Sequence, residues 1–189
     1  MRIITLDIET TGAGSGGFDP SAMEMSLIGI HDSSNDEYSS YTVPELAGLW
    51  PILERADMLV GYNSDHFDIP ILNKYYSGDL TKIRSLDLLA EIKNVLGRRL
   101  KLDSIAKATL GVRKSGHGLD AVKWWAEGKV DKVRKYCLDD VRITKDIYLY
   151  ALKNGRVAYD DFGKKREIPL DTTHWETPVV QAITHTLPF

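Results

Sequence analysis

Short apolar runs and polar turns alternate along the first third of the chain, which is the pattern of β-strands. Residues 2–8, with the sequence RIITLDI, are predicted to form a buried strand. Residues 25–31 and 36–42 are predicted to form two further strands on either side of the polar turn SSND. Three strands with short links of this kind form an antiparallel meander.

The next part of the chain combines strands with helices. Pro44 occupies the first-turn position that proline favours, and it predicts a helix to about Ala56. A fourth strand follows at residues 57–62, and a short strand within residues 83–89 runs into a helix. Strand–helix–strand units add parallel neighbours to a sheet. We therefore predict an α/β fold with a mixed sheet, in which an antiparallel meander and parallel strands are flanked by α-helices.

The last third is predicted to be mainly helical and to end in a hairpin. Residues 102–153 show helical periodicity that is broken at Gly111, at residues 115–118 and at Gly128. The sequence GRVAYDDFGKKREIPL indicates a hairpin, and the basic run at residues 164–166 is predicted to lie in its turn.

The length of 189 residues, with 43% hydrophobic and 27% charged residues, is ordinary for a soluble globular domain. We place the main domain at residues 1–155, and the hairpin and tail at 156–189 are either part of it or loosely attached. Cys137 is the only cysteine, so no internal disulfide can form and a reducing compartment is compatible. The strand pattern begins at Arg2, which leaves no room for a signal peptide, and no apolar run approaches the roughly 20 residues of a membrane span. These features predict a cytoplasmic protein without a membrane partner.

The net charge of −3 hides an asymmetry along the chain. Residues 1–60 hold ten acids and two bases, whereas the remaining residues hold 17 acids and 22 bases. One basic cluster contains a single acid, Asp103, among Arg98, Arg99, Lys101, Lys107, Arg113 and Lys114. An acidic centre with basic flanks suits a polyanion that is held by its phosphates and cut at a metal. A solvated helical surface explains the same charges equally well.

Asp7 and Glu9 stand at the end of the first strand with one residue between them. Side chains alternate across a strand, so the two carboxylates point to the same face. Two like charges this close resist joint ionisation unless a cation lies between them, and hard carboxylate oxygens suit Mg²⁺ or Mn²⁺. The competing interpretation is an exposed strand end with two solvated acids.

Two later segments add acids to this pattern. Asp68 follows the fourth strand in GYNSDHFD and could equally be the N-cap of the next helix. In the C-terminal helix, the core face is marked by Val133, Cys137, Val141 and Tyr148. Tyr136 and Asp140 are four residues apart and form a row beside that face, whereas Asp139 points elsewhere.

Together these motifs resemble one family, the ribonuclease H-like 3′–5′ exonuclease superfamily, in its subtype with four acids and a tyrosine. The resemblance consists of D-x-E on the first strand, N-x-x-x-F-D after the fourth and Y-x-x-x-D on a late helix, and it spans roughly residues 2–150. The first motif, LDIETTG, is a very close match. Lys135 stands where histidine-bearing relatives place their histidine, so the tyrosine subtype fits and the histidine subtype does not.

The resemblance implies a catalytic role for five residues and a site for two Mg²⁺ or Mn²⁺ ions. Asp7 would contact both metals. Glu9 and Asp140 would complete the metal that holds the attacking water, and Asp68 would help to hold the second metal. Tyr136 would orient the water.

The resemblance also implies a substrate, which is the 3′ end of single-stranded DNA or RNA, shortened with release of nucleoside 5′-monophosphates. Thr10 and Thr11 would meet the terminal nucleotide. Asn63 and Phe67 would line the same pocket, although Phe67 could equally belong to the core. Lys114 could track the phosphate strand. A polymerase or a helicase is a candidate partner that would supply the substrate.

Three alternatives compete with this interpretation. The segment DIETT comes near the D-x-D-x-T motif of haloacid dehalogenase-like phosphatases, but its second acid is Glu9. A ribonuclease H-like endonuclease would keep the fold and cut internally. A non-catalytic nucleic-acid module would have lost site residues, whereas all four acids and Tyr136 are present.

Among other residues, Trp124 and Trp125 could stack on bases or belong to the core, and Asp87 is predicted to cap a helix.

Overall fold

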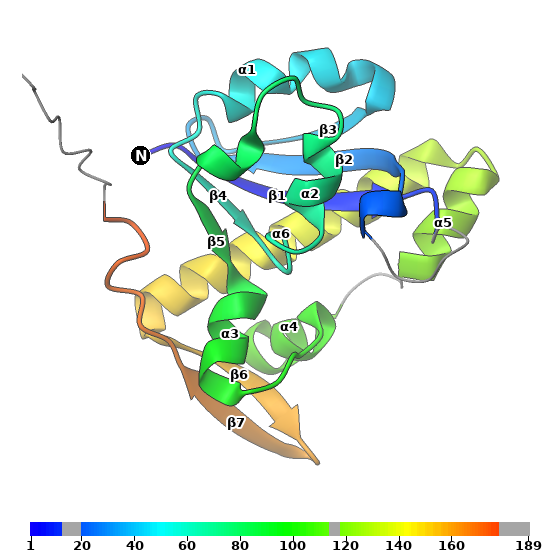
Figure 1. Cartoon of the computed structure of the whole chain (residues 1–189). Coiled ribbons are helices and arrows are strands. Elements are labelled where there is room, and N and C mark those ends of the chain that lie inside the picture. Colours follow the sequence, from blue (N-terminus) through cyan, green and yellow to red (C-terminus); the bar gives the residue numbers. More distant parts are fainter. Residues whose placement is uncertain (13–19, 114–117, 178–189) are drawn as a thin grey trace, which may run out of the picture.

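The centre of the molecule is a five-stranded mixed sheet with the strand order β3-β2-β1-β4-β5 (Figure 1). The computed structural model describes residues 1–12, 20–113 and 118–177. Lys114 and most of the glycine-rich loop after the first strand lie outside the described residues. The strands are β1 (Ile3–Thr10), β2 (Met25–Asp32), β3 (Glu37–Thr42), β4 (Met58–Gly61) and β5 (Ser85–Asp87). The first three strands pair antiparallel, and β4 and β5 add parallel neighbours, which confirms the predicted fold class.

Helices and short 3₁₀ turns connect and cover the strands. The α-helices are α1 (Trp50–Leu53), α2 (Asp68–Asn73), α3 (Leu88–Leu96), α4 (Leu102–Leu110), α5 (Gly118–Ala126) and α6 (Val130–Asn154). The 3₁₀ turns are η1 (Pro20–Ala22), η2 (Val43–Gly48) and η3 (Leu80–Lys82). The helix predicted from Pro44 to Ala56 is divided between η2 and α1. Gly111 and Gly128 have φ angles of 75° and 72°, so the predicted helix breaks at these two glycines are confirmed. None of the helices in the described ranges is long and apolar enough to cross a membrane.

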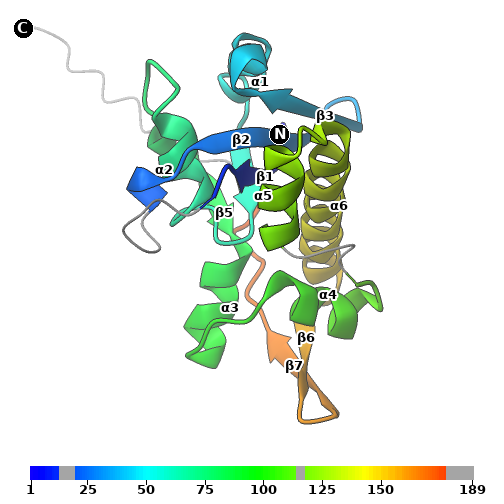
Figure 2. The same ribbon diagram turned by 90° about the vertical axis from the view of Figure 1, so that its right-hand side faces the viewer.

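Alternation along β1 sends its side chains to two different layers. Ile4, Leu6 and Ile8 join a buried cluster with α1 and α2 on one face of the sheet. The opposite face is covered by α6, and Figure 2 shows α2 and α6 on opposite sides of β1. Asp7 and Glu9 lie on this second face, as the two-residue period predicts.

Helix α6 approaches the sheet unusually closely at Gly29 on β2. A Cβ atom at this position would lie 2.9 Å from Cys137 Sγ, and Leu138 and Val141 would be 3.1 and 3.2 Å away. The register of β1 and β2 places Gly29 directly opposite Asp7. The absence of a side chain at Gly29 therefore lets α6 approach the strand that carries the acids. The predicted core face of α6 is confirmed, since Val133, Cys137, Val141 and Tyr148 are all buried.

The predicted hairpin is present as β6 (Arg156–Asp161) and β7 (Lys164–Pro169). Its turn is Phe162–Gly163, so the basic run at 164–166 begins β7 and the prediction that it lies in the turn was wrong. Val157 and Ile168 of the hairpin share a buried cluster with α3, α4 and α6. Trp175 beyond it is also buried and stacks on Tyr148, with 5.9 Å between ring centroids.

Candidate active site

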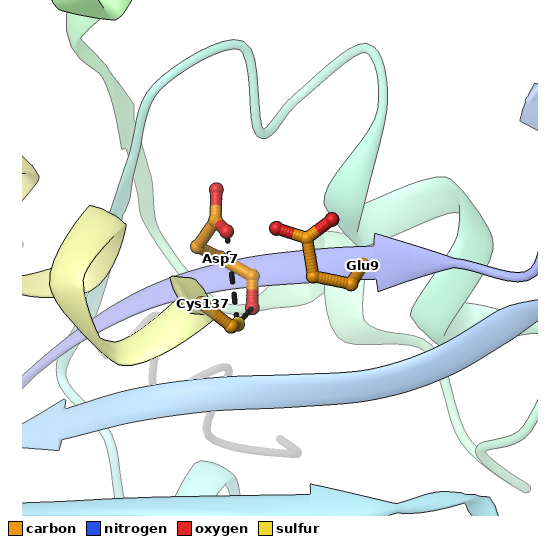
Figure 3. A group of neighbouring side chains, drawn as sticks. All are labelled: Asp7, Glu9 and Cys137. Carbon is orange, nitrogen blue, oxygen red and sulfur yellow. Dashed lines mark hydrogen bonds between the residues drawn. The ribbon is translucent and has the colours of Figure 1, made fainter. Parts of the chain in front are cut away.

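The C-terminal half of β1 carries Asp7 and Glu9 on the face that packs against α6 (Figure 3). Glu9 is 7% exposed, and Asp7 is half-buried. One ligand atom each from Asp7, Glu9 and Cys137 lies within 4.8 Å of the other two. The solvated strand end considered as the alternative is therefore not what the structure shows for Glu9.

Asp68 reaches across to the same strand. Its carboxylate accepts a hydrogen bond of 2.8 Å from the backbone N–H of Ile8, which lies between the two acids of β1. Ile8 is beyond the last pair of the β1–β4 ladder, which ends at Thr5 and Val60, so Asp68 takes the place of a strand partner there. The alternative N-cap role is wrong, because α2 starts at Asp68 itself and Phe67 is the capping position.

Burial dominates the electrostatics of Asp68. Its removal from water raises its pKa to about 7, the nearby Asp87 charge adds to the rise, and backbone N–H donors, led by that of Ile8, oppose it. A carboxylate in this position is costly to ionise unless a cation shares its charge.

Asp140 brings α6 into the same group of acids. It is 2% exposed. Burial, followed by the charges of Asp7, Glu9 and Asp140, raises the pKa of the Cys137 thiol well above its usual value. Three carboxylates from two elements thus act on one thiol, while Asp68 joins from a third element.

Cys137 is the site residue that sequence reasoning missed. We predicted it only as a core position of α6, yet its thiol donates to the backbone carbonyl of Asp7 at 3.2 Å and lies 3.7 Å from Asp7 Oδ2. The raised pKa keeps the thiol protonated, so it acts as a donor that ties α6 to β1. The sequence did contain a signal for this role, because residues three apart on a helix are neighbours and Cys137 is three residues before Asp140.

The donor set fits a hard divalent cation. Asp7, Glu9, Asp68 and Asp140 supply carboxylate oxygens, which Mg²⁺ and Mn²⁺ prefer, and three of the four are nearly inaccessible to solvent. A protonated thiol adds no ligand of comparable strength. The family resemblance implied metal binding by these four residues. In the structure Asp7, Glu9 and Asp140 lie around Cys137, and Asp68 accepts from the N–H of Ile8, between Asp7 and Glu9.

Tyr136 lies one helical turn before Asp140 and is 2% exposed. Its ring meets Trp124 edge-on, with centroids 6.1 Å apart and planes at 75°. Trp124 and Trp125 are partly buried against the same cluster, which favours the core interpretation of both. Tyr136 also lines a cavity, so its ring is held by packing on one side and borders open space on another.

That cavity has a volume of about 630 Å³. Its polar lining consists of Tyr62, Asn63, Arg99, Lys101, Asp103 and Tyr136. Asn63 has a φ angle of 71°, and its backbone N–H donates to Asp87 at 2.7 Å. Asp87 also accepts from Leu89 N at 2.9 Å, so the predicted helix cap is confirmed and additionally fixes the loop after β4. The Arg99 guanidinium donates to the Asn63 side chain.

The structure places the other predicted substrate residues as follows. Thr10 and Thr11 continue directly from Glu9, and the backbone N–H of exposed Thr11 donates to Glu24 O at 2.9 Å. Phe67 is partly buried against the cluster that contains α1 and α2, which favours the core alternative for it. Lys114 is outside the described residues.

Comparison with known proteins supports the fold independently. A solved structure with the same architecture is that of the family B DNA polymerase from the hyperthermophilic archaeon Pyrobaculum calidifontis, with a TM-score of 0.61 and 20% sequence identity. The match covers 80% of this chain and 24% of the polymerase chain. No curated protein sequence matches the chain.

The sequence profile of the RNase H superfamily matches residues 4–152. This range contains all four acids, Tyr136 and all of the five-stranded sheet except its first residue, Ile3. It removes the haloacid dehalogenase-like phosphatase from the alternatives. The chain therefore belongs to the RNase H superfamily.

Proposed function

We propose that the protein is a metal-dependent 3′–5′ exonuclease that hydrolyses phosphodiester bonds from a free 3′ end. The observation that carries this proposal is the approach of carboxylates from α2 and α6 to the two acids of β1. Tyr136, one helical turn before Asp140, lines a cavity together with the basic residues Arg99 and Lys101. Nucleic acid is the substrate class that matches hard-metal ligands next to basic side chains.

Each acid would bind in a defined way. Asp7, Glu9 and Asp140 would hold one divalent cation, and Asp7 with Asp68 would hold a second. Two such cations neutralise the phosphodiester, lower the pKa of an attacking water and steady the leaving oxygen. Tyr136 would orient that water through its hydroxyl, because its ring is already fixed by Trp124 and Cys137 anchors the same helical turn to β1.

The proposed direction of cleavage rests on the family resemblance and on the position of two hydroxyls. Thr10 and Thr11 follow Glu9 immediately, where they would meet a terminal sugar. Arg99 and Lys101 line the cavity and would hold phosphates upstream of the bond that is cut. Single-stranded or frayed ends would be preferred, since a paired end must first be opened. A polymerase or a helicase is the kind of partner that would present such ends.

Labelled oligonucleotides test the proposal. Single-stranded DNA and RNA carrying a 5′ label, incubated with Mg²⁺ or Mn²⁺, should give a ladder that shortens from the 3′ end, with nucleoside 5′-monophosphates released. A 3′-phosphate should slow the reaction, and EDTA should stop it. A single-stranded circle of the same sequence should be resistant. If the circle is cut as fast as the linear strand, the protein is an endonuclease instead.

A further inference from the structure

The turn of the β6–β7 hairpin carries an aromatic residue that folding does not explain. Phe162 is fully exposed and has a φ angle of 51°, followed by Gly163 at 82°. Positive φ at both central residues is the requirement of a type I′ turn, for which Asn-Gly is favoured and a bulky aromatic is not. Neither local conformation nor core burial therefore favours phenylalanine here, and such an outlier points to a function.

The hairpin is a firm support for this residue. The Thr109 hydroxyl on α4 donates to Ala158 O at 3.1 Å and accepts from Ala158 N at 2.9 Å, which fixes β6 to the helix. Figures 1 and 2 both show the turn projecting from the body of the molecule below α4. Phe162 is thus held out into solvent on an anchored arm.

A second cavity lies beside the same arm. It has a volume of about 350 Å³ and is lined by Lys107, Ala108, Thr109, Gly111, Asp160 and Lys165. Asp160 already accepts a hydrogen bond from Gly163 N at 2.9 Å within the turn. Lys107, Lys164 and Lys165 are exposed, and none of them forms a salt bridge with another described residue. The cavity therefore presents an excess of positive charge next to an exposed aromatic ring.

Helix α4 connects this cavity to the candidate active site. Asp103 lines the larger cavity and Lys107 lines the smaller one, and their spacing of four residues puts both on one face of the helix. Gly111, the C-cap of α4, also lines the smaller cavity. The nine residues of α4 span about 13 Å. A strand that leaves the active site can therefore follow this face to the hairpin.

We propose that the end of α4 and the β6–β7 hairpin form a second binding surface for single-stranded nucleic acid, upstream of the active site. Phe162 would stack on a base, and Lys107 and Lys165 would contact phosphates. Every base has a face on which an aromatic ring can stack, so this surface would bind without sequence preference. The choice of nucleic acid as ligand rests on the proposed function, whereas the existence of the surface rests on the hairpin itself.

The test measures binding of a labelled single-stranded oligonucleotide by fluorescence anisotropy, in the full chain carrying Asp140→Asn so that the strand is not cut. Phe162→Asn should weaken binding roughly five- to a hundredfold, the range found for the loss of one stacked base. The same substitution should leave the melting temperature unchanged or raise it, because Asn-Gly is the favoured type I′ pair. Phe162→Trp should retain binding.

The lysines are tested separately. Lys107→Gln combined with Lys165→Gln should reduce the slope of log K against log salt concentration by roughly one to two, one for each lost phosphate contact. Leu149→Asn and Lys153→Gln, exposed positions on α6 outside both cavities, are the matched controls and should bind like the parent. In otherwise native protein, kcat/KM for a long strand relative to a trinucleotide should fall for Phe162→Asn.

Unchanged affinity for the oligonucleotide in Phe162→Asn and in the double lysine variant would overturn the inference. The exposed hairpin tip would then be interpreted as a contact site for a protein partner. A lower melting temperature together with lost binding in Phe162→Asn would assign Phe162 a structural role and would also overturn its stacking role. Failure of the proposed function would look different, because the native protein would bind strands through this surface and not shorten them.

Discussion

Buried carboxylates occur at both ends of β1, and they differ in the groups that contact them and in the direction of their pKa shifts. At the start of the strand, the Arg2 guanidinium donates to Asp32, with 3.2 Å from Nε to each carboxylate oxygen. The bond to Arg2 lowers the pKa of Asp32 to about 2. At the end of the strand, Asp68 is held by a backbone N–H, and burial raises its pKa to about 7. One end of β1 therefore lies beside an acid whose charge is neutralised by an internal base, and the other end lies beside an acid that is costly to ionise.

This difference separates structural acids from site acids. A guanidinium beside Asp32 shows that the fold can accommodate a partner for a carboxylate where stability requires one. Asp7, Glu9 and Asp140 instead gather around a protonated thiol, and Asp68 accepts from the backbone N–H between Asp7 and Glu9. This arrangement suits an external cation better than an internal base. Sites of this kind lower the stability of the unliganded protein in exchange for function. Substitutions at the two ends should therefore have opposite effects on folding.

The largest effect is expected at the acidic end. Asp7→Asn and Asp140→Asn should each reduce hydrolysis of a 5′-labelled single strand below detection, because an amide does not replace a carboxylate that holds a divalent cation.

In EDTA, Asp68→Asn should be at least as stable as the native protein in urea unfolding, because it removes a buried acid and its amide oxygen can still accept from Ile8.

Metal addition provides the complementary measurement. Mn²⁺ at about 100 times its Kd should stabilise the native protein by about 2.7 kcal/mol, and EDTA should reverse the gain. Asp7→Asn should show little of this stabilisation. Equal stabilisation of the native protein and of Asp7→Asn would show that the cation binds elsewhere.

The next largest loss of activity is expected for Tyr136→Phe. A hydroxyl that orients water contributes less than a metal ligand, so turnover should fall roughly 10²-fold. The stabilisation by Mn²⁺ should stay close to that of the native protein, because the ring still packs against Trp124. Native turnover in this variant would assign Tyr136 to packing alone.

A smaller loss of kcat is expected when α6 is displaced and the four acids themselves are unchanged. Gly29→Ala brings a Cβ to 2.9 Å from Cys137 Sγ, so α6 must move by a few tenths of an ångström. Displacing Asp140 from the acids of β1 in this way should cost roughly tenfold in kcat, less than the roughly 10²-fold expected for a shift of about 1 Å. The unfolding free energy should fall by about 1–3 kcal/mol from overpacking.

The combination with Cys137→Ala separates packing from chemistry. The double variant removes the shortest contact, so its kcat should exceed that of Gly29→Ala alone if displacement of α6 is the cause. Cys137→Ala by itself is the control for the lost thiol hydrogen bond. Additive losses in the double variant would contradict this explanation.

Local periodicity was sufficient to predict part of the site. The period of two put Asp7 and Glu9 on one face, and the helical period put Tyr136 and Asp140 in one row beside the core face of α6. The sheet and its mixed pairing followed from the order of the strands and helices. These features depend only on neighbours along the chain.

The parts that could not be predicted depend on contacts between distant segments. Asp68 looked like an N-cap because capping signals are local, whereas its real partner, Ile8, is 60 residues away. The proximity of Cys137 to Asp7 depends on how closely α6 packs, and that closeness depends on Gly29. The strained turn at Phe162 was not predicted, because the alternating pattern of a hairpin locates its two strands better than it locates the turn between them.

The smallest expected effect is at the structural end of β1. The folded-state pKa of Asp32, about 2, lies below the usual value of 3.8, so its contribution to stability is complete above about pH 4 and disappears as the pH falls through 2. Asp32→Asn should therefore lose on the order of 1 kcal/mol at neutral pH, a figure reduced because Arg2 is partly solvated. Urea unfolding of both proteins between pH 6 and pH 2, spanning about two units on either side of the usual carboxyl pKa, measures this difference. The gap between native protein and variant should close as the solution becomes acidic. A gap that stays constant across this range would mean that the Arg2–Asp32 pair does not stabilise the fold through its charge, and the contrast between the two ends of β1 would then rest on Asp68 alone.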